Sequence, residues 1–152
     1  MCIRDRNKPD LKIVCTGQPF NRKEIALFNN WKISNQLFHV SASDEQLMSL
    51  YKYALFFVYP SLYEGFGIPI LEAFKNECPV CLSNSSCFPE IAESAACYFD
   101  PLDSDSILEA VNILLTDQDY VQQLRTQGKN RLKFFSLAKM VRGTCDIYEK
   151  VV

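Results

Sequence analysis

Short apolar runs and longer amphipathic stretches alternate along this chain, which predicts strands alternating with helices. The apolar runs predict strands at Lys12–Thr16, Leu37–Val40, Ala54–Tyr59, Pro79–Ser83 and Ala96–Phe99. The amphipathic stretches predict helices over Asn21–Trp31, from Ser43, over Pro69–Asn76, from Phe88, from Asp103 or Ser104, over Asp119–Arg131 and from Ser136. This alternation favours an α/β protein with a doubly wound parallel sheet.

Polar residues before several of these stretches predict where the helices begin. Ser43-Asp44-Glu45-Gln46 forms a capping box, in which Ser43 is the N-cap and Gln46 the third helical residue. Gly128 is a weak point of the helix that contains it, because glycine lowers helix propensity. The helix that begins at Ser43 is expected to carry Leu47, Met48 and Tyr51 inward. Two other helices have an apolar face: Ile25, Phe28 and Trp31 in the first, and Leu137, Met140, Val141, Tyr148, Val151 and Val152 in the last.

Residues 61–72, with the sequence SLYEGFGIPILE, carry the candidate chemistry. They follow the run Ala54–Tyr59, which is expected to be a fully buried parallel strand. Pro69 suits the first turn of a helix, and glycines before it allow a sharp turn or the close approach of a ligand. Free N–H groups at such a helix start attract phosphate oxygens. The sequence therefore predicts an anion site with Glu64 beside it and Glu72 behind it.

Composition indicates an ordinary globular chain and excludes some partners. The 152 residues suit one domain, with 48% hydrophobic and 22% charged residues. A formal net charge of −2 gives no basic face for nucleic acid. No signal peptide or apolar run of membrane-spanning length occurs.

The cysteines predict a reducing, cytoplasmic location rather than a disulfide framework, because they are scattered and odd in number. They are Cys2, Cys15, Cys78, Cys81, Cys87, Cys97 and Cys145. The pair Cys78 and Cys81 has the spacing of a metal or redox motif. It spans a helix exit and an apolar strand, with no second pair, so we interpret both as small apolar core residues.

The stretch from Glu64 to Glu72 resembles the signature of the retaining glycosyltransferases of the GT-B fold, glycosyltransferase family 4 (group 1). That signature has two glutamates separated by seven residues, with Gly-Phe-Gly after the first, as in Glu64-Gly65-Phe66-Gly67. Further matches are Asp44-Glu45-Gln46-Leu47, Pro79-Val80, Ser83-Asn84, Pro89-Glu90, Asp100-Pro101 and Phe135-Ser136. The resemblance covers residues 10–152 and implies the Rossmann-like carboxyl-terminal half of such an enzyme, which binds the sugar donor.

The resemblance implies a role for each motif residue. Glu64, the catalytic candidate, would bind hydroxyls of the donor sugar, and Glu72 would bind the ribose hydroxyls. The backbone of Gly65 and Phe66 would face the sugar, while the amides of Gly67 and Ile68 would face the diphosphate. The substrate-binding set is Gly65, Phe66, Gly67, Ile68, Leu71 and Glu72. Two alternatives stay open: Glu64 as a helix-capping carboxylate and Glu72 as an exposed helical residue.

The resemblance also implies what the enzyme uses and what this chain lacks. It implies a nucleotide-diphosphate-sugar donor, no metal and no cofactor, and a saccharide or lipid-linked acceptor. The family's amino-terminal acceptor-binding domain, where any peripheral membrane contact would lie, is expected to be missing. The first strand of the donor half, with its basic loop, is also expected to be missing between the strands at 12–16 and 54–59. We therefore expect this chain alone to be inactive and marginally stable, with residues 1–9 a non-native or disordered leader.

Departures from the family pattern leave other functions open. Val40 and Glu77 stand where the family usually has glycine, and Leu137 stands where it usually has tryptophan. At the exit of the motif helix, Asn76 is expected to adopt the left-handed conformation in place of that glycine. The alternative to a glycosyltransferase is a non-catalytic nucleotide-sugar-binding or interaction domain of the same fold. A sugar-nucleotide epimerase is disfavoured by the Gly-Phe-Gly motif.

Overall fold

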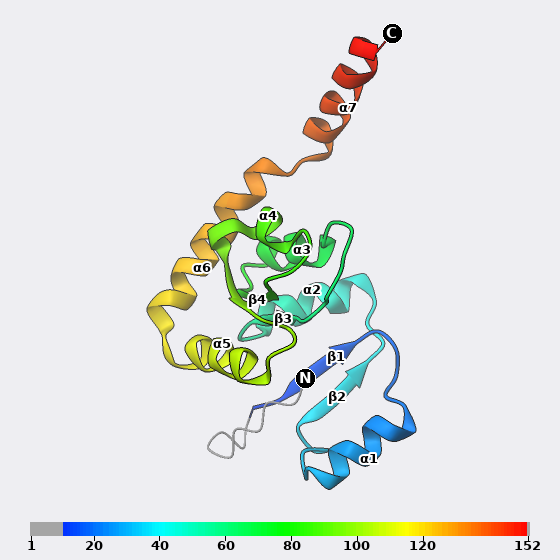
Figure 1. The fold of residues 1–152 in the computed structure, drawn as a ribbon, viewed down its shortest axis with the longest axis vertical. Helices are drawn as coiled ribbons and strands as arrows, with labels where there is room; N and C mark the ends of the chain where they lie inside the picture. The colour runs from blue at the N-terminus through cyan, green and yellow to red at the C-terminus, as the bar shows by residue number, and fades with distance from the viewer. Residues whose placement is uncertain (1–10, 152) are drawn as a thin grey trace. The chain divides into compact units, whose positions relative to one another are not determined.

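The computed structural model describes residues 11–151, and the chain divides into two compact units, residues 1–47 and 48–152 (Figure 1). The expected leader at residues 1–9 lies outside the described part. The strands form two parallel sheets, β1–β2 and β3–β4–β5, rather than one. Within the described residues, β1 pairs with β2 alone and β3 with β4 alone. The α/β class with parallel strands is therefore confirmed.

The first unit is a βαβ arrangement of β1 (Ile13–Thr16), α1 (Arg22–Asn30) and β2 (Leu37–Val40), with Ile13 opposite Leu37. A capping box starts α1: the Asn21 side chain accepts from the Glu24 N–H, and Glu24 Oε2 accepts from the Asn21 N–H at 2.7 Å. The apolar face of this helix is largely accessible: Ile25 and Trp31 are 47% and 41% exposed. α1 contains no buried residue.

α2 (Asp44–Tyr53) begins with the predicted capping box. Gln46 Oε1 accepts from the Ser43 N–H at 2.9 Å, and the Ser43 hydroxyl accepts from the Gln46 N–H at 3.4 Å. Of the three side chains expected to face inward, Tyr51 is buried, and Leu47 and Met48 are partly exposed. α2 thus brings Tyr51 into the second unit's core.

The second unit contains a three-stranded sheet in which β4 (Val80–Ser83) lies between β3 (Phe57–Tyr59) and β5 (Ala96–Phe99). All residues of β4 are buried, whereas those of β3 are half-buried. The expectation of a fully buried strand over 54–59 was wrong. β3 lies at the edge of this sheet. Its hydrogen bonds to β4 begin at Phe57, whose N–H donates to the Pro79 carbonyl. Leu55, before that point, is 61% exposed.

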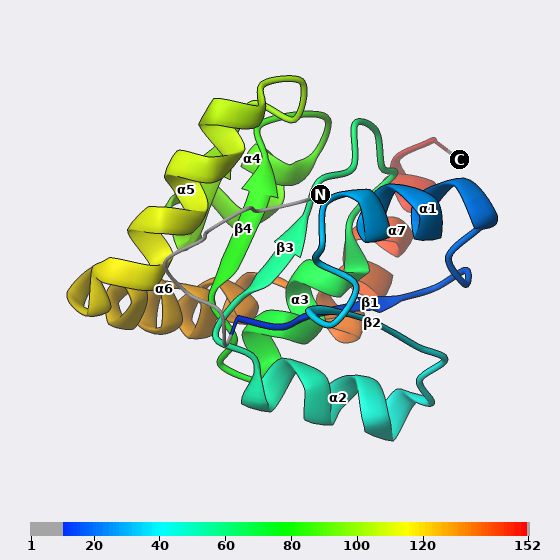
Figure 2. The ribbon, with the colours of Figure 1, turned by 90° about the horizontal axis from the view of Figure 1, so that it is seen from below.

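Helices cover both faces of this sheet. Val58 and Cys81 point to the face where α5 (Ser104–Thr116) and α6 (Gln118–Arg131) pack through Ala110, Leu114, Val121 and Leu124. Because side chains alternate along a strand, Phe57 and Tyr59 point the other way. There they contact Tyr51 of α2 and Phe88 of α4 (Phe88–Ala92), with ring centroids 5.2 and 4.9 Å apart. Figure 2 shows α5 and α3 (Ile68–Lys75) on opposite sides of β3 and β4.

Short connections complete the unit. η1 (Glu93–Ala95) follows α4, and η2 (Leu132–Phe134) joins α6 to α7 (Leu137–Val151). Asp103 caps α5 by accepting from the Asp105 N–H, and Ser136 caps α7 by accepting from the Lys139 N–H at 3.1 Å. These two predicted caps are confirmed. The apolar face of α7 is exposed, however, with Leu137 73%, Met140 62% and Tyr148 70% accessible.

Gly128 is a packing residue rather than a weak point of α6. It is buried, and a Cβ atom built on it would lie 2.6 Å from Cδ1 of Phe74 in α3. The missing side chain therefore lets the ring of Phe74 lie directly against the α6 backbone. Relative to alanine, glycine at position 128 costs about 1 kcal/mol in helix propensity. The steric overlap of an alanine methyl group with Phe74 outweighs that cost.

Cysteines are buried in β4, just before it and in the neighbouring β5, as the sequence interpretation expects. Cys78 and Cys81 are 1% and 0% exposed, and Cys81 stands opposite Cys97 in the register of β4 and β5. Burial raises the pKa of Cys78 to about 12. A hydrogen bond to Cys97, together with burial, raises the pKa of Cys81. These thiols therefore stay protonated and behave as small apolar side chains.

The exit of α3 differs from the expectation, because Glu77 rather than Asn76 adopts the left-handed conformation. Asn76 has a φ of −96°, and Glu77 a φ of +56°. The Cys78 N–H donates to the Ala73 carbonyl and the Glu77 N–H to the Phe74 carbonyl. This pair of bonds defines a Schellman motif, in which the bond from Cys78 to Ala73 requires a left-handed residue at position 77.

We expect Glu77→Gly to unfold with a free energy about 1 kcal/mol higher than Glu77→Ala, because alanine keeps the strained φ and glycine relieves it. Both variants lose the exposed ion pair between Glu77 and Lys129, which spans 3.0 Å, so its contribution cancels in the comparison. Urea unfolding followed by circular dichroism measures the difference. Equal stability of the two variants would contradict a strained residue 77.

Candidate functional site

The motif loop connects β3 to α3 and turns at Gly67. α3 begins at Ile68, one residue before the predicted start, with Pro69 in its first turn. Gly67 is the N-cap, with φ +88° and ψ +48°, and no side chain caps the helix. Because this conformation is left-handed, it favours glycine.

The two motif glycines differ in what surrounds them. A Cβ atom on Gly67 would lie 3.0 Å from Ile70 Cδ1 and 3.1 Å from Phe88 Cε1, whereas one on Gly65 would meet nothing within 4 Å. Gly67 is buried and Gly65 is exposed. Gly67 is therefore needed for the turn and its packing, and Gly65 is the position where a missing side chain leaves open space for a ligand.

We expect Gly67→Ala to lower the free energy of unfolding by about 1–3 kcal/mol, through the left-handed φ and the contacts with Ile70 and Phe88. Gly65→Ala is the matched control, expected to change stability by less than about 0.5 kcal/mol. Thermal unfolding of the two variants measures the difference. A Gly67→Ala variant as stable as Gly65→Ala would show that the turn does not require glycine.

Glu64 is held through its side chain by hydroxyl groups. Its Oε1 accepts from the Tyr59 hydroxyl at 2.7 Å and from the Ser61 hydroxyl at 2.9 Å. Burial, together with the hydrogen bond to Glu64, raises the pKa of Tyr59 to about 12, so this hydroxyl stays a donor. The alternative that Glu64 caps α3 was wrong, because α3 has no side-chain cap.

Glu64 is also held through its backbone, by the loop after β4. The Ser86 hydroxyl accepts from the Glu64 N–H at 3.2 Å and donates to the Glu64 carbonyl at 2.8 Å. The Cys87 thiol donates to the same carbonyl at 3.4 Å. Ser86 has a φ of +56°, a strained conformation for a residue other than glycine. The backbone of two loops is thus tied together at Glu64.

Glu72 lies on α3 behind the loop, half-buried rather than exposed. The Tyr51 hydroxyl donates to its Oε2 at 3.4 Å, which is long for an O–H···O bond. Burial and the charge of Glu72 raise the pKa of Tyr51. The alternative of an exposed helical Glu72 was therefore wrong.

The remaining predicted site residues are more accessible. Gly65 is exposed, Phe66 and Ile68 are 43% and 61% exposed, and Leu71 is half-buried. The Phe66 ring meets that of Phe135 edge-on, at 5.8 Å between centroids. Gly65, Phe66 and Ile68 are thus exposed to solvent, Gly67 is buried between them, and both glutamates are only partly exposed. Donor contacts by these residues stay a prediction.

Sequence reasoning missed the residues that orient the two glutamates. Tyr51, Tyr59 and Ser86 were given no role in the predicted site. One signal was available, because a buried tyrosine hydroxyl requires a hydrogen-bond partner and the motif supplies two carboxylates nearby. No comparable signal marks Ser86, which is distant in sequence from Glu64.

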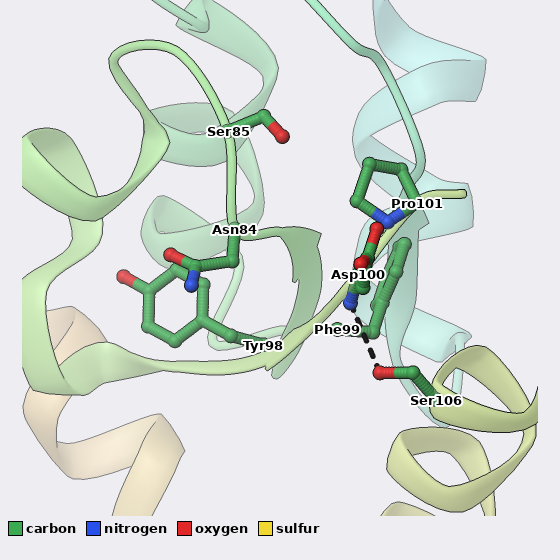
Figure 3. Close-up of a pocket in the computed structure, with 7 residues that line it drawn as sticks. All are labelled: Asn84, Ser85, Tyr98, Phe99, Asp100, Pro101 and Ser106. Atoms are coloured by element: carbon green, nitrogen blue, oxygen red, sulfur yellow. Dashed lines mark hydrogen bonds between the residues drawn. The ribbon is translucent and has the colours of Figure 1, made fainter. Parts of the chain in front are cut away.

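A separate hollow of about 360 Å³ lies where β4 and β5 end (Figure 3). Figure 3 shows Asn84 and Ser85 in the segment after β4, Asp100 and Pro101 after β5, and Ser106 on α5. Within it the Asp100 N–H donates to the Ser106 hydroxyl at 3.0 Å. None of the predicted site residues lines this pocket.

Acidic side chains of the described residues do not gather into a metal site. Residues 11–151 contain no group of three or more His, Cys, Asp or Glu side chains arranged to hold a metal ion. Two Asp-x-Asp triplets occur, at 103–105 and 117–119, and their first carboxylates cap α5 and α6 by accepting from backbone N–H groups. Nor does this described range contain a helix both long and apolar enough to span a membrane.

Parallel strands, a glycine-bounded helix start and two anchored glutamates define a Rossmann-like domain of the kind found in the carboxyl-terminal half of GT-B glycosyltransferases. The family model for glycosyl transferases group 1 matches residues 2–131. This chain belongs to that family.

Relatives and solved structures agree with this family. The chain is 39% identical over 106 residues to O-antigen chain mannosyltransferase B of Escherichia coli, covering 70% of this chain and 28% of that protein. It is 30% identical over 124 residues to the MMP alpha-(1->4)-mannosyltransferase of Mycolicibacterium hassiacum, covering 78% and 30%. The carboxyl-terminal domain of a group 1 glycosyl transferase (LpcC) from Francisella tularensis superposes with a TM-score of 0.72 at 22% identity, covering 84% of this chain and 71% of that domain.

Proposed function

We propose that this chain is the donor-binding part of a retaining, metal-independent glycosyltransferase that takes its sugar from a nucleotide-diphosphate sugar. The chain spans less than a third of the length of the two curated relatives described above. Catalysis would therefore need an acceptor-binding part outside these residues. The observation that carries the proposal is the pair of partly buried carboxylates, Glu64 before the Gly67 helix start and Glu72 after it, with Glu64 held by short hydrogen bonds.

Each part of that arrangement suits one part of a nucleotide sugar. The amides at Gly67 and Ile68, at the positive end of α3, suit the diphosphate, which gains negative charge as the sugar leaves. Glu64, next to the exposed backbone of Gly65, suits hydroxyls of the sugar. Glu72, further along α3, suits the ribose hydroxyls. Carboxylates accept from hydroxyls without donating, which makes them selective for such groups.

Mannose is the sugar we propose for the donor, because both curated relatives described above are named mannosyltransferases. GDP-mannose is accordingly the first probe, with UDP-glucose and ADP-glucose beside it. The alternative, a domain that binds nucleotide sugars without catalysis, predicts the same binding and no transfer. An assay for transfer in a chain that includes the acceptor-binding part separates the two.

The binding test is a ¹H–¹⁵N NMR titration of this chain with the three nucleotide sugars, up to the millimolar range so that weak binding is seen. We expect GDP-mannose to shift the amides of residues 64–72. Gly65→Ala is the variant to compare with the wild type in this titration. It leaves the fold unstrained and places a methyl group at the proposed ligand surface. Shifts confined to other regions, or none with any of the three sugars, would refute the proposed donor site.

A further inference from the structure

The two carboxylate oxygens of Glu64 are not equivalent. Oε1 accepts two hydrogen bonds, from Tyr59 at 2.7 Å and from Ser61 at 2.9 Å. Within the described residues, no hydrogen bond to Oε2 is found. A carboxylate oxygen has about two lone-pair positions, so Oε1 has no capacity left for a ligand.

We propose that Tyr59 is a positioning residue which, together with Ser61, commits Oε1 of Glu64 to the protein and leaves Oε2 as the oxygen that meets the donor sugar. This inference rests on the proposed function and deepens it. Glu64 then accepts from the sugar through one oxygen, and its orientation is set before the donor arrives. Preorganised acceptors avoid the cost of ordering a flexible glutamate on binding.

The supports of Glu64 come from three directions. Tyr59 ends β3, Ser61 begins the motif loop, and Ser86 belongs to the loop after β4. Ser86 fixes the backbone of Glu64 by bonding both its N–H and its carbonyl, so the two hydroxyl bonds act on a side chain whose Cα is already placed. Tyr59 in turn packs on the fully buried ring of Phe88. The orientation of the carboxylate is thus tied to the core.

Glu72, the other glutamate of the motif, is restrained by fewer and longer hydrogen bonds than Glu64. Its one described hydrogen bond, from Tyr51 to Oε2, spans 3.4 Å, and none to Oε1 is found among the described residues. Glu72 therefore retains both oxygens for a ligand and can bind the paired hydroxyls of a ribose. The contrast assigns different tasks to the two motif glutamates: Glu64 offers one oxygen to the sugar, and Glu72 offers both of its oxygens to the ribose.

The first test measures the orientation of Glu64 without any donor. Three-bond couplings from Glu64 Cγ to its backbone nitrogen and carbonyl carbon report χ1 in this chain. We expect one rotamer in the wild type and in Tyr63→Phe, the matched control, because Tyr63 is 83% exposed in the same loop. Tyr59→Phe, and more so Tyr59→Phe with Ser61→Ala, should show rotamer averaging. A single Glu64 rotamer in the double variant would overturn the inference.

The second test separates positioning from support of the fold. In an enzyme that includes the acceptor-binding part, Tyr59→Phe should lower kcat by on the order of tenfold to a hundredfold, with KM and melting temperature unchanged. Tyr63→Phe should keep the wild-type kcat. Wild-type kcat in Tyr59→Phe would overturn the positioning role. Absence of donor binding by the wild type, with the rotamer result intact, would overturn the proposed function and leave the Tyr59–Glu64 contact standing.

Discussion

Glu64→Ala is expected to lower turnover by on the order of a hundredfold to a thousandfold in an enzyme that contains this domain and its acceptor-binding part. The reason is that the Glu64 carboxylate is oriented by two hydroxyl groups and its backbone is held by a third, next to the exposed Gly65 where the sugar would lie. Steady-state kinetics with GDP-mannose measures the loss. Folding is checked in parallel, because the hydroxyls of Tyr59 and Ser61 lose their acceptor.

Glu72→Ala is the matched comparison for Glu64→Ala. It is expected to weaken donor binding by about 1–3 kcal/mol through lost hydrogen bonds to a charged group, with a smaller effect on turnover at saturating donor. We therefore expect Glu64→Ala to change mainly kcat and Glu72→Ala to change mainly the KM for the donor. Wild-type kinetics in both variants would refute the assignment of the site to this motif.

Phe88→Ala is expected to lower the free energy of unfolding by about 3–5 kcal/mol, a large share of the stability of a domain this size. The ring of Phe88 is fully buried. It contacts Tyr59 at 4.9 Å between centroids, and a Cβ on Gly67 would meet it at 3.1 Å. Its loss leaves a cavity beneath both the motif turn and the tyrosine that holds Glu64. Urea unfolding followed by circular dichroism measures the change.

Phe134→Ala serves as the control for Phe88→Ala. Phe134 is 57% exposed, and its described ring contacts are with the cationic side chains of Arg131 and Lys139. Removing it is expected to cost about 1 kcal/mol or less. A Phe88→Ala variant no less stable than Phe134→Ala would mean that α4 is not a support of the motif turn.

Local signals in the sequence were enough for much of the second unit. Ser136, and Asp103 as one of two candidates with Ser104, were predicted as caps from side chains that bond to their own helix, which requires no knowledge of the fold. The strand at Ala96–Phe99 was predicted with its observed bounds. β3 was predicted too long because an apolar run does not reveal which of its residues find a partner strand.

The candidate site was located by its motif but not explained by it. Gly65 and Gly67 look alike in the sequence, and only the packing of Phe88 and Ile70 shows that Gly67 serves the turn. The hydrogen bonds of Tyr51 and Tyr59 depend on how α2, β3 and the loop pack in three dimensions. Likewise, the strain at Glu77 follows from a Schellman motif that a non-glycine residue completes.

The division into two units has a spectroscopic consequence. The single tryptophan, Trp31, belongs to residues 1–47, and all seven tyrosines belong to residues 48–152. Tryptophan fluorescence therefore reports the first unit, and tyrosine near-ultraviolet dichroism the second, without any label. Coincident unfolding curves would show that the units melt as one cooperative body. If the curves separate, a nucleotide sugar bound at residues 64–72 should raise the midpoint of the tyrosine signal and leave that of tryptophan in place.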